Sequence, residues 1–100
     1  MGGSQGRALD EMSNEALMEL FRDGDLRAFE LLVDRTEARL FNFIFRQVGH
    51  RELANDLLQE TYLRVVKNAA KYSPRARFTT WACTIARNLC RDEFRRQRHR

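Results

Sequence analysis

Long apolar runs are absent from this 100-residue chain, and their absence bears on where the protein resides. No apolar segment approaches the roughly 18 residues that a membrane-spanning helix needs. The first residues also lack the apolar segment of a secretory signal peptide. We therefore expect a cytoplasmic protein that does not insert into a membrane.

Groups of residues that carry catalysis or bind a metal are equally scarce. Neither of the two histidines is spaced from a nucleophile in a recognisable catalytic arrangement, and there is no glycine-rich phosphate loop. Cys83 and Cys90 would lie about 10 Å apart along a helix axis, too far for a disulfide, so two buried or half-buried thiols are expected. Asp56 and Glu60 are one helical turn apart, but beside Arg64 they are more typical of a solvated face than of a metal site. We therefore expect that the protein is not an enzyme and that it binds neither a metal nor a cofactor.

Glycine and proline are few, and they separate stretches in which apolar residues recur every three or four positions. No stretch shows the alternation of a half-buried strand. Ser13 or Asn14 can cap a first helix, Asp25 can cap a second that Gly49 ends, and Thr79 or Thr80 can cap the last. The predicted helices cover residues 14–22, 26–48, about 52–72 (before Pro74) and about 80–98.

These patterns predict an all-α fold, a compact bundle of one short and three longer helices. Residues 1–11 are expected to form a flexible tail and residues 12–98 the folded domain. The predicted core consists of apolar residues from the three longer helices: Phe29, Phe41, Ile44, Leu58, Val65, Trp81, Ile85 and Leu89.

The net charge of +4 is distributed very unevenly. Residues 1–63 hold 12 acidic residues against 7 arginines, whereas residues 64–100 hold 11 basic residues against 2 acidic ones. The basic half indicates a surface for a polyanion such as nucleic acid. The alternative is that these arginines are solvated and favoured at helix C-termini. The stripe that they form opposite the apolar side of residues 80–98 favours nucleic acid: Thr84, Arg87, Asn88, Arg91, Arg95 and Arg98.

The third predicted helix carries a polar side of a different kind. Carboxylates and an amide gather opposite its apolar stripe, and Leu63 stands in the middle of them. An apolar side chain on a polar face can mark the centre of a protein interface, although isolated exposed leucines are common. One helix thus favours a protein partner and the next a nucleic acid.

Four segments resemble the second conserved region of bacterial sigma factors, best in the extracytoplasmic-function group. Residues 56–64, 72–81 and 85–92 carry the resemblance, and residues 25–33 are similar to that group's first helix pair. The similarity covers roughly residues 12–98, with the four motifs in the same order and at the same separations as in the family.

The resemblance implies a specificity subunit of RNA polymerase that acts in transcription initiation. In the family, the Asp-x-x-Gln-Glu helix docks on the clamp helices of the largest polymerase subunit. The matching polymerase-binding positions are Asp56, Gln59, Glu60, Leu63 and Arg64.

The resemblance also implies capture of the non-template strand of the promoter minus-ten element as single-stranded DNA, which helps to melt it. Such binding needs cations along phosphates and planar or amide groups for an unpaired base. Asn88 carries an amide suited to a base edge. Tyr72 and Phe78 are candidates for stacking on a base or for the core, and Trp81 is expected in the core. The DNA-binding positions implied are Lys71, Tyr72, Arg75, Arg77, Phe78, Thr84, Arg87, Asn88, Arg91 and Arg95.

Two positions depart from the family pattern, and both bear on clamp affinity. Asn55 stands where many relatives have an acid, and Val66 stands where an aromatic is usual. Residues 99–100 would begin a linker to the family's helix-turn-helix domain, which reads the minus-thirty-five element.

The resemblance also implies an inhibitory partner, an anti-sigma protein.

Two other functions fit the basic half of the chain. One is a helical module that binds RNA or DNA without a role in initiation. The other is a peripheral membrane protein whose basic last helix meets anionic lipid, but that helix has few residues that could insert beyond Trp81.

Overall fold

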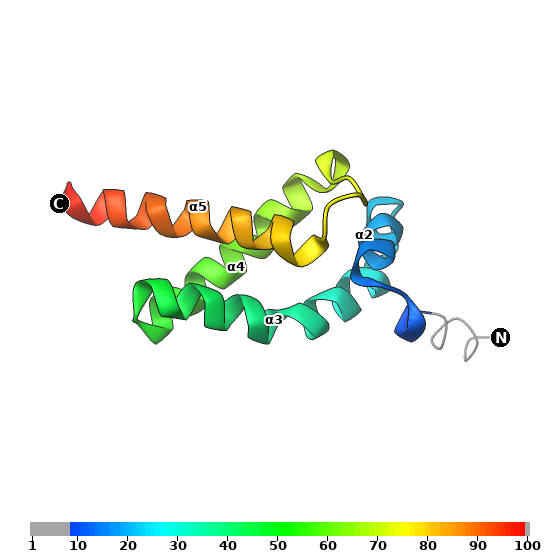
Figure 1. Cartoon of the computed structure of the whole chain (residues 1–100), viewed down its shortest axis with the longest axis horizontal. Coiled ribbons are helices and arrows are strands. Elements are labelled where there is room, and N and C mark those ends of the chain that lie inside the picture. Colours follow the sequence, from blue (N-terminus) through cyan, green and yellow to red (C-terminus); the bar gives the residue numbers. More distant parts are fainter. Residues whose placement is uncertain (1–8, 100) are drawn as a thin grey trace.

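A computed structural model of the chain describes residues 9–99. Within that range all regular structure is helical, as the sequence predicts, and the elements follow one another through short turns (Figure 1). They are α2 (Asn14–Arg22), α3 (Leu26–Val48), α4 (Arg51–Lys67), the short 3₁₀ helix η1 (Ala69–Lys71) and α5 (Phe78–Arg98).

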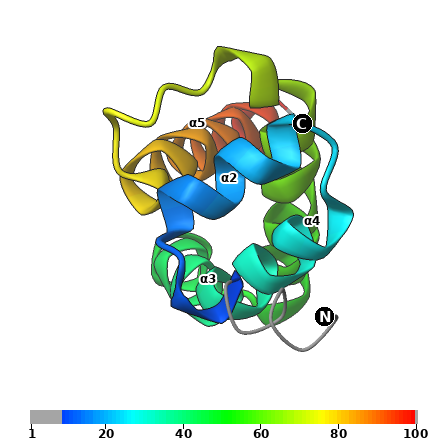
Figure 2. The ribbon, with the colours of Figure 1, turned by 90° about the vertical axis from the view of Figure 1, so that its right-hand side faces the viewer.

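The three long helices form the body of the molecule, and α2 closes one end of it. Seen from that end, α2 lies across the bundle, where it contacts α3, η1 and α5 (Figure 2). The C-terminal turns of α5 extend past the connection between α3 and α4 (Figure 1). The buried residues of α5 extend from Phe78 to Glu93, and residues 94–99 are exposed.

Local capping explains why α2 and α3 have the predicted bounds. The Ser13 hydroxyl accepts the backbone N–H of Ala16, and the Asp25 carboxylate accepts those of Arg27 and Ala28. These side chains satisfy donors that a helix leaves unpaired in its first turn. Gly49 ends α3 at φ 68°, a left-handed conformation that glycine adopts without a steric penalty.

The other two long helices differ from the prediction at one end each. α4 stops at Lys67 and continues as a tighter 3₁₀ turn, so the expected single helix to about residue 72 is two elements. α5 begins at Phe78, two residues before the predicted start, and neither Thr79 nor Thr80 caps it. Its first N–H is bonded instead by the Glu15 carboxylate of α2, at 2.7 Å. A cap supplied by another helix cannot be predicted from the residues next to the helix start.

The core contains two clusters of buried residues. One joins α2, α3, the end of α4 and the start of α5 around Leu17, Met18 and Phe78, and the other joins α3, α4 and α5 around Ile44 and Cys90. Of the predicted core, Ile44, Val65 and Leu89 are buried, whereas the remaining five residues are partly buried and pack against the clusters: Phe29, Phe41, Leu58, Trp81 and Ile85.

Cys83 is half-buried and Cys90 is buried, and both are free thiols, as predicted. Burial raises the pKa of both thiols, which keeps them in the less reactive protonated form.

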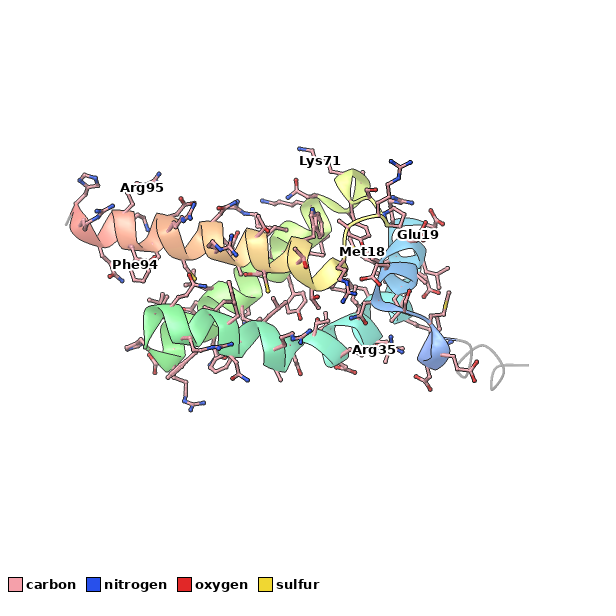
Figure 3. The ribbon with its side chains drawn as sticks, in the orientation of Figure 1. Met18, Glu19, Arg35, Lys71, Phe94 and Arg95 are labelled. Atoms are coloured by element: carbon pink, nitrogen blue, oxygen red, sulfur yellow. The ribbon has the colours of Figure 1, made fainter. Side chains whose placement is uncertain are left out.

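The N-terminal segment is described only from Leu9 onward, so most of the tail expected over residues 1–11 lies outside the described residues. Residues 9–11 are helical. The Arg35 guanidinium, labelled in Figure 3, donates to the backbone carbonyls of Asp10 and Met12 at 2.6 Å each. Across residues 9–99, no helix combines the length and the apolar character needed to cross a membrane.

Candidate protein and nucleic-acid interfaces

The polar side of α4 is open to solvent and has an apolar side chain at its centre. Asp56, Gln59 and Leu63 are exposed, and 56% of the Leu63 surface remains accessible. Glu60 is half-buried and accepts a hydrogen bond from Arg64 at 3.1 Å, which leaves the pair partly neutralised. α4 thus presents a carboxylate and an amide around an exposed leucine.

Leu63 is not isolated, because it borders an apolar groove between α3 and α4. Val66, one helical turn further along α4, is 44% exposed, and Phe29, Val33 and Leu58 continue the lining. The groove has a volume of about 670 Å³. The sequence suggested Leu63 as an interface centre, but it did not show that Val66 extends the same patch.

Tyr62, which lines the groove, shares a partly buried hydrogen bond with Thr36 of the neighbouring helix. The hydroxyls of Tyr62 and Thr36 are 2.6 Å apart. Burial raises the pKa of Tyr62 to about 12, so its phenol stays neutral at physiological pH. Tyr62 therefore lines the groove as a neutral phenol whose hydroxyl is already hydrogen-bonded.

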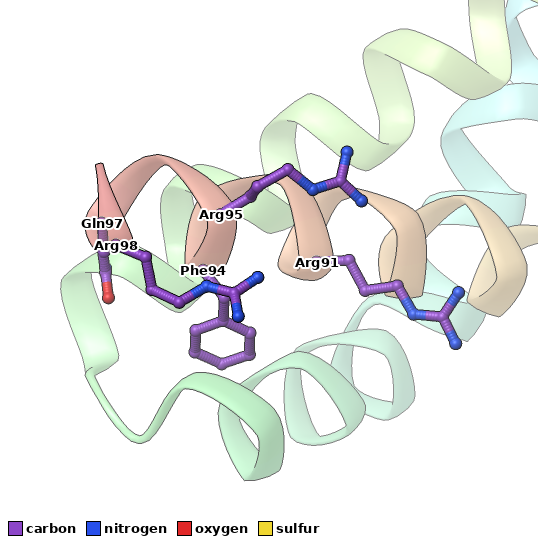
Figure 4. Close-up of a pocket in the computed structure, with 5 residues that line it drawn as sticks. All are labelled: Arg91, Phe94, Arg95, Gln97 and Arg98. Atoms are coloured by element: carbon purple, nitrogen blue, oxygen red, sulfur yellow. The ribbon is translucent and has the colours of Figure 1, made fainter. Parts of the chain in front are cut away.

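One side of α5 carries a row of arginines that extend into solvent. Arg87, Asn88, Arg91 and Arg95 are all exposed, and Figure 4 shows Arg91 and Arg95 projecting from successive turns. Within the part of the chain that the structure describes, their side chains make no hydrogen bond or ion pair, unlike Arg96, which pairs with Glu93 at 2.6 Å. Guanidinium groups left unpaired in this way are available to phosphates.

Thr84 contributes less to this row than its position suggests. It is exposed, but its hydroxyl donates to the carbonyl of Thr80 at 3.0 Å. The hydroxyl hydrogen is therefore already used within the helix, and only the oxygen lone pairs remain for a ligand.

η1 and the loop between it and α5 present their cations outward. Lys71, Arg75 and Arg77 are exposed. In Figure 3, Lys71 beside η1 and Arg95 near the C-terminal end of α5 both extend toward the upper edge of the view. η1, the loop and α5 therefore all carry exposed cations.

Tyr72 and Phe78, which the sequence offered as residues for stacking on a base or for the core, lie in the core. Their assignment as DNA-binding residues is therefore wrong. Tyr72 is 2% exposed and Phe78 is fully buried, and both rings lie against Trp81. The Tyr72 hydroxyl also donates to the carbonyl of Ala76 at 2.6 Å. These rings support the loop from below, and neither presents a face to an unpaired base. Trp81 is half-buried, so part of its ring is accessible.

Two residues of α2 that the sequence did not single out hold this loop in place. Arg22 donates to the Tyr72 carbonyl at 3.0 Å, and Glu15 accepts the N–H of Phe78. The pKa of Tyr72 is raised to about 12 by burial and then by the negative charges of Glu15 and Glu19. Separations of 50 and 63 positions carry no signal that periodicity or spacing could reveal.

Metal-binding groups do not gather anywhere in residues 9–99, where no three or more His, Cys, Asp or Glu side chains converge. Asp56 and Glu60, the pair one turn apart on α4, lie beside Arg64, which bonds Glu60.

Comparisons with known proteins agree with the resemblance found in the sequence. Residues 32–100 match the family model for sigma-70 region 2. The RNA polymerase sigma factor CarQ of Myxococcus xanthus is 48% identical over 82 residues, which cover 82% of this chain and 47% of that protein. The extracytoplasmic-function sigma factor BldN of Streptomyces coelicolor is 35% identical over 85 residues, covering 84% of this chain and 32% of that protein. The chain thus spans about half or less of the length of these relatives.

A solved structure has the same fold. It is an engineered region 2 of sigmaE in complex with GTAAAA, and it matches with a TM-score of 0.79 and 25% identity over 87% of this chain and 90% of that one.

Proposed function

This chain belongs to the sigma-70 region 2 family, in the extracytoplasmic-function group, and we propose that it binds core RNA polymerase and the opened minus-ten element of a promoter. The proposed role is that of a transcription initiation domain, which acts by binding its partners and catalyses no reaction. The observation that carries the proposal is the separation of two exposed surfaces on neighbouring helices. α4 offers an apolar centre with an acidic and amide rim, whereas α5 offers a row of unpaired guanidinium groups.

The α4 surface has the composition of a protein interface. Leu63 and Val66 supply apolar area that gains free energy when it leaves water, and Asp56 and Gln59 form a polar rim beside it. A partner with basic and apolar residues on a helix pair fits this pattern. The polymerase clamp helices are the partner that the family resemblance implies, with Asp56, Gln59, Glu60, Leu63 and Arg64 as contacts.

The α5 surface and its preceding loop have the composition of a single-strand binding site. Arg87, Arg91 and Arg95 can neutralise successive phosphates of the non-template strand, and Asn88 can read the edge of an unpaired base. Lys71 at the end of η1, and Arg75 and Arg77 in the loop that follows, add positive charge beside α5. Similarity to a region 2 that was solved in complex with GTAAAA supports DNA as the ligand.

Charge reversal separates the two surfaces. The double variant Asp56→Lys, Glu60→Lys is expected to lose capture of core polymerase, while its affinity for a labelled minus-ten single strand stays within about twofold of the starting protein. Glu30→Lys, at an exposed position of α3, is the control that changes charge elsewhere. If the double variant captures polymerase as well as the control does, the assignment of α4 is wrong.

The same experiment distinguishes the other candidate functions. A nucleic-acid module unrelated to initiation would show no capture of polymerase by any variant. An anti-sigma protein, which we propose as a further partner because of the family, would be tested by whether its presence blocks either interaction.

A further inference from the structure

A second group of arginines faces α5 from α3. Arg39 and Arg46 of α3 and Arg87 of α5 line one groove between the two helices, together with the hydroxyls of Thr79 and Thr80. The groove has a volume of about 330 Å³, and no Asp or Glu is found among its described lining residues. Three like charges around one groove repel one another, and an anion relieves that repulsion.

Most N–H groups of the three guanidinium groups in the groove have no hydrogen-bond acceptor within residues 9–99. Within residues 9–99, Arg39 and Arg87 make no side-chain hydrogen bond or ion pair, and Arg46 makes only a long bond of 3.4 Å to the carbonyl of Asn42 in its own helix. This contrasts with Arg35, one turn before Arg39, whose guanidinium is occupied by the N-terminal carbonyls. Each free guanidinium offers a planar set of N–H groups that matches two oxygens of a phosphate.

The lining of the groove also contains two less polar side chains. These are Phe43 and Cys83, and both are half-buried. Burial raises the pKa of the Cys83 thiol, and the charges of Arg39 and Arg87 pull it back down, so both cations act on the same sulfur. Half-buried apolar neighbours lower the local dielectric and so strengthen the attraction between the arginines and an anion.

We propose that the groove between α3 and α5 binds a backbone phosphate of the single-stranded DNA that follows the α5 arginine row, with Arg39 and Arg46 as additional DNA-binding residues. The proposal rests on the proposed function, since Arg87 belongs both to the arginine row and to the groove. The strand would lie with its phosphates between two helices rather than along α5 alone. A phosphate contact of this kind positions the strand and carries no sequence preference.

Salt-dependent binding tests the role of Arg39. Affinity for a labelled single strand that contains GTAAAA is measured by anisotropy from about 50 to about 200 mM salt, for Arg39→Glu and for Arg27→Glu. Arg27 is also exposed on α3 but lies about 18 Å away along the helix axis, so the two variants change the net charge equally. Arg39→Glu is expected to weaken binding roughly tenfold and to reduce the salt slope by about 0.7, as for one lost phosphate contact. A scrambled strand is expected to lose the same factor, and Arg39→Lys to keep most of the affinity. If Arg39→Glu and Arg27→Glu behave alike, the groove is not a phosphate site.

Protection of Cys83 provides an independent readout. A bound strand is expected to slow alkylation of Cys83 by iodoacetamide at least threefold, as measured by mass spectrometry, while buried Cys90 stays unmodified in all samples. Inorganic phosphate at the same concentration is expected to give no protection, because a single anion lacks the contacts of the neighbouring nucleotides. Equal alkylation with and without the strand overturns the proposal.

Failure of the proposed function gives a different pattern. If strands protect Cys83 without any preference for minus-ten sequence and no polymerase is captured, the phosphate site stands and the role in initiation falls. If Arg39→Glu weakens polymerase capture and leaves DNA binding unchanged, the groove is a protein contact and the phosphate site falls.

Discussion

The Glu15 carboxylate accepts a hydrogen bond from the backbone N–H of Phe78 at 2.7 Å, and so α2 caps a helix that begins 63 positions later. Arg77, which precedes α5, makes no side-chain cap of its own. On the same helix as Glu15, Arg22 holds the carbonyl of Tyr72. α2 therefore fixes both ends of the loop that carries Arg75 and Arg77.

Removal of the Glu15 carboxylate should destabilise the fold. We expect Glu15→Ala to lower the free energy of unfolding by about 1–2 kcal/mol, because an N-terminal donor of α5 loses its partner. Glu15→Gln, which keeps an acceptor oxygen, should recover part of the loss. Urea unfolding followed by circular dichroism measures the change, with Glu30→Ala as the exposed control. Equal unfolding midpoints for Glu15→Ala and Glu30→Ala would contradict this capping role.

The buried phenol of Tyr72 should make stability fall in alkaline solution. Its pKa is about 12 in the folded protein and 10.0 in the unfolded reference, so between these values the unfolded chain loses a proton that the folded chain keeps. The neutral phenol therefore contributes its full share to the free energy of unfolding below pH 10. That share, roughly 1–3 kcal/mol, is lost as the pH rises toward 12.

Tyr72→Phe tests that reasoning. The variant should be about 1 kcal/mol less stable at neutral pH, because the bond to the Ala76 carbonyl is gone. Above pH 10 its stability should decline less steeply than that of the starting protein, with Tyr62 responsible for part of the remaining decline. Urea midpoints from about pH 8 to about pH 11 give both quantities. Parallel curves for the two proteins would show that Tyr72 does not titrate as described.

Leu63 should matter for polymerase binding and hardly at all for folding. Because 56% of its surface is exposed, Leu63→Ser should change the free energy of unfolding by no more than about 0.5 kcal/mol. Capture of core polymerase should weaken roughly tenfold or more, as for an interface centre. Leu26→Ser, at a leucine that is 68% exposed at the start of α3, is the matched control. A pull-down with purified core polymerase in which both variants bind equally would remove Leu63 from the interface.

Asn88 and Arg91 should affect DNA binding in different ways. Asn88→Ala should reduce discrimination among minus-ten variants, by about 1–3 kcal/mol for a bidentate contact to a base edge. Arg91→Ala should weaken all single strands similarly and reduce the dependence of affinity on salt. A panel of short single strands, each with one changed base, measures both effects. If Asn88→Ala keeps the full sequence preference, another residue reads the base.

Much of the fold was predictable because its determinants are local. The caps Ser13 and Asp25 bond to N–H groups two or three residues away, and Gly49 ends α3 at the expected place. The spacing of apolar residues marks the buried side of each helix in the same way. Exposure of Leu63 and of the α5 arginines follows from the same periodicity.

Two features that the sequence predicted wrongly or left open involve residues far apart in the sequence. The start of α5 depends on Glu15, and the burial of Tyr72 depends on α2 packing over the loop. An aromatic residue beside arginines has the same local pattern whether it stacks on DNA or fills a core. Only the packing of α2 against the loop and α5 decides between the two.

The amino-acid sequence by itself determined the helices, the uneven charge and the family, because each depends on residue types at short or fixed separations. The tertiary structure decided which aromatic rings are buried, which helix caps α5 and which arginines of α3 meet Arg87 across a groove. These features arise when helices pack, and the free energy of packing depends on shape and burial between segments that no spacing along the chain relates.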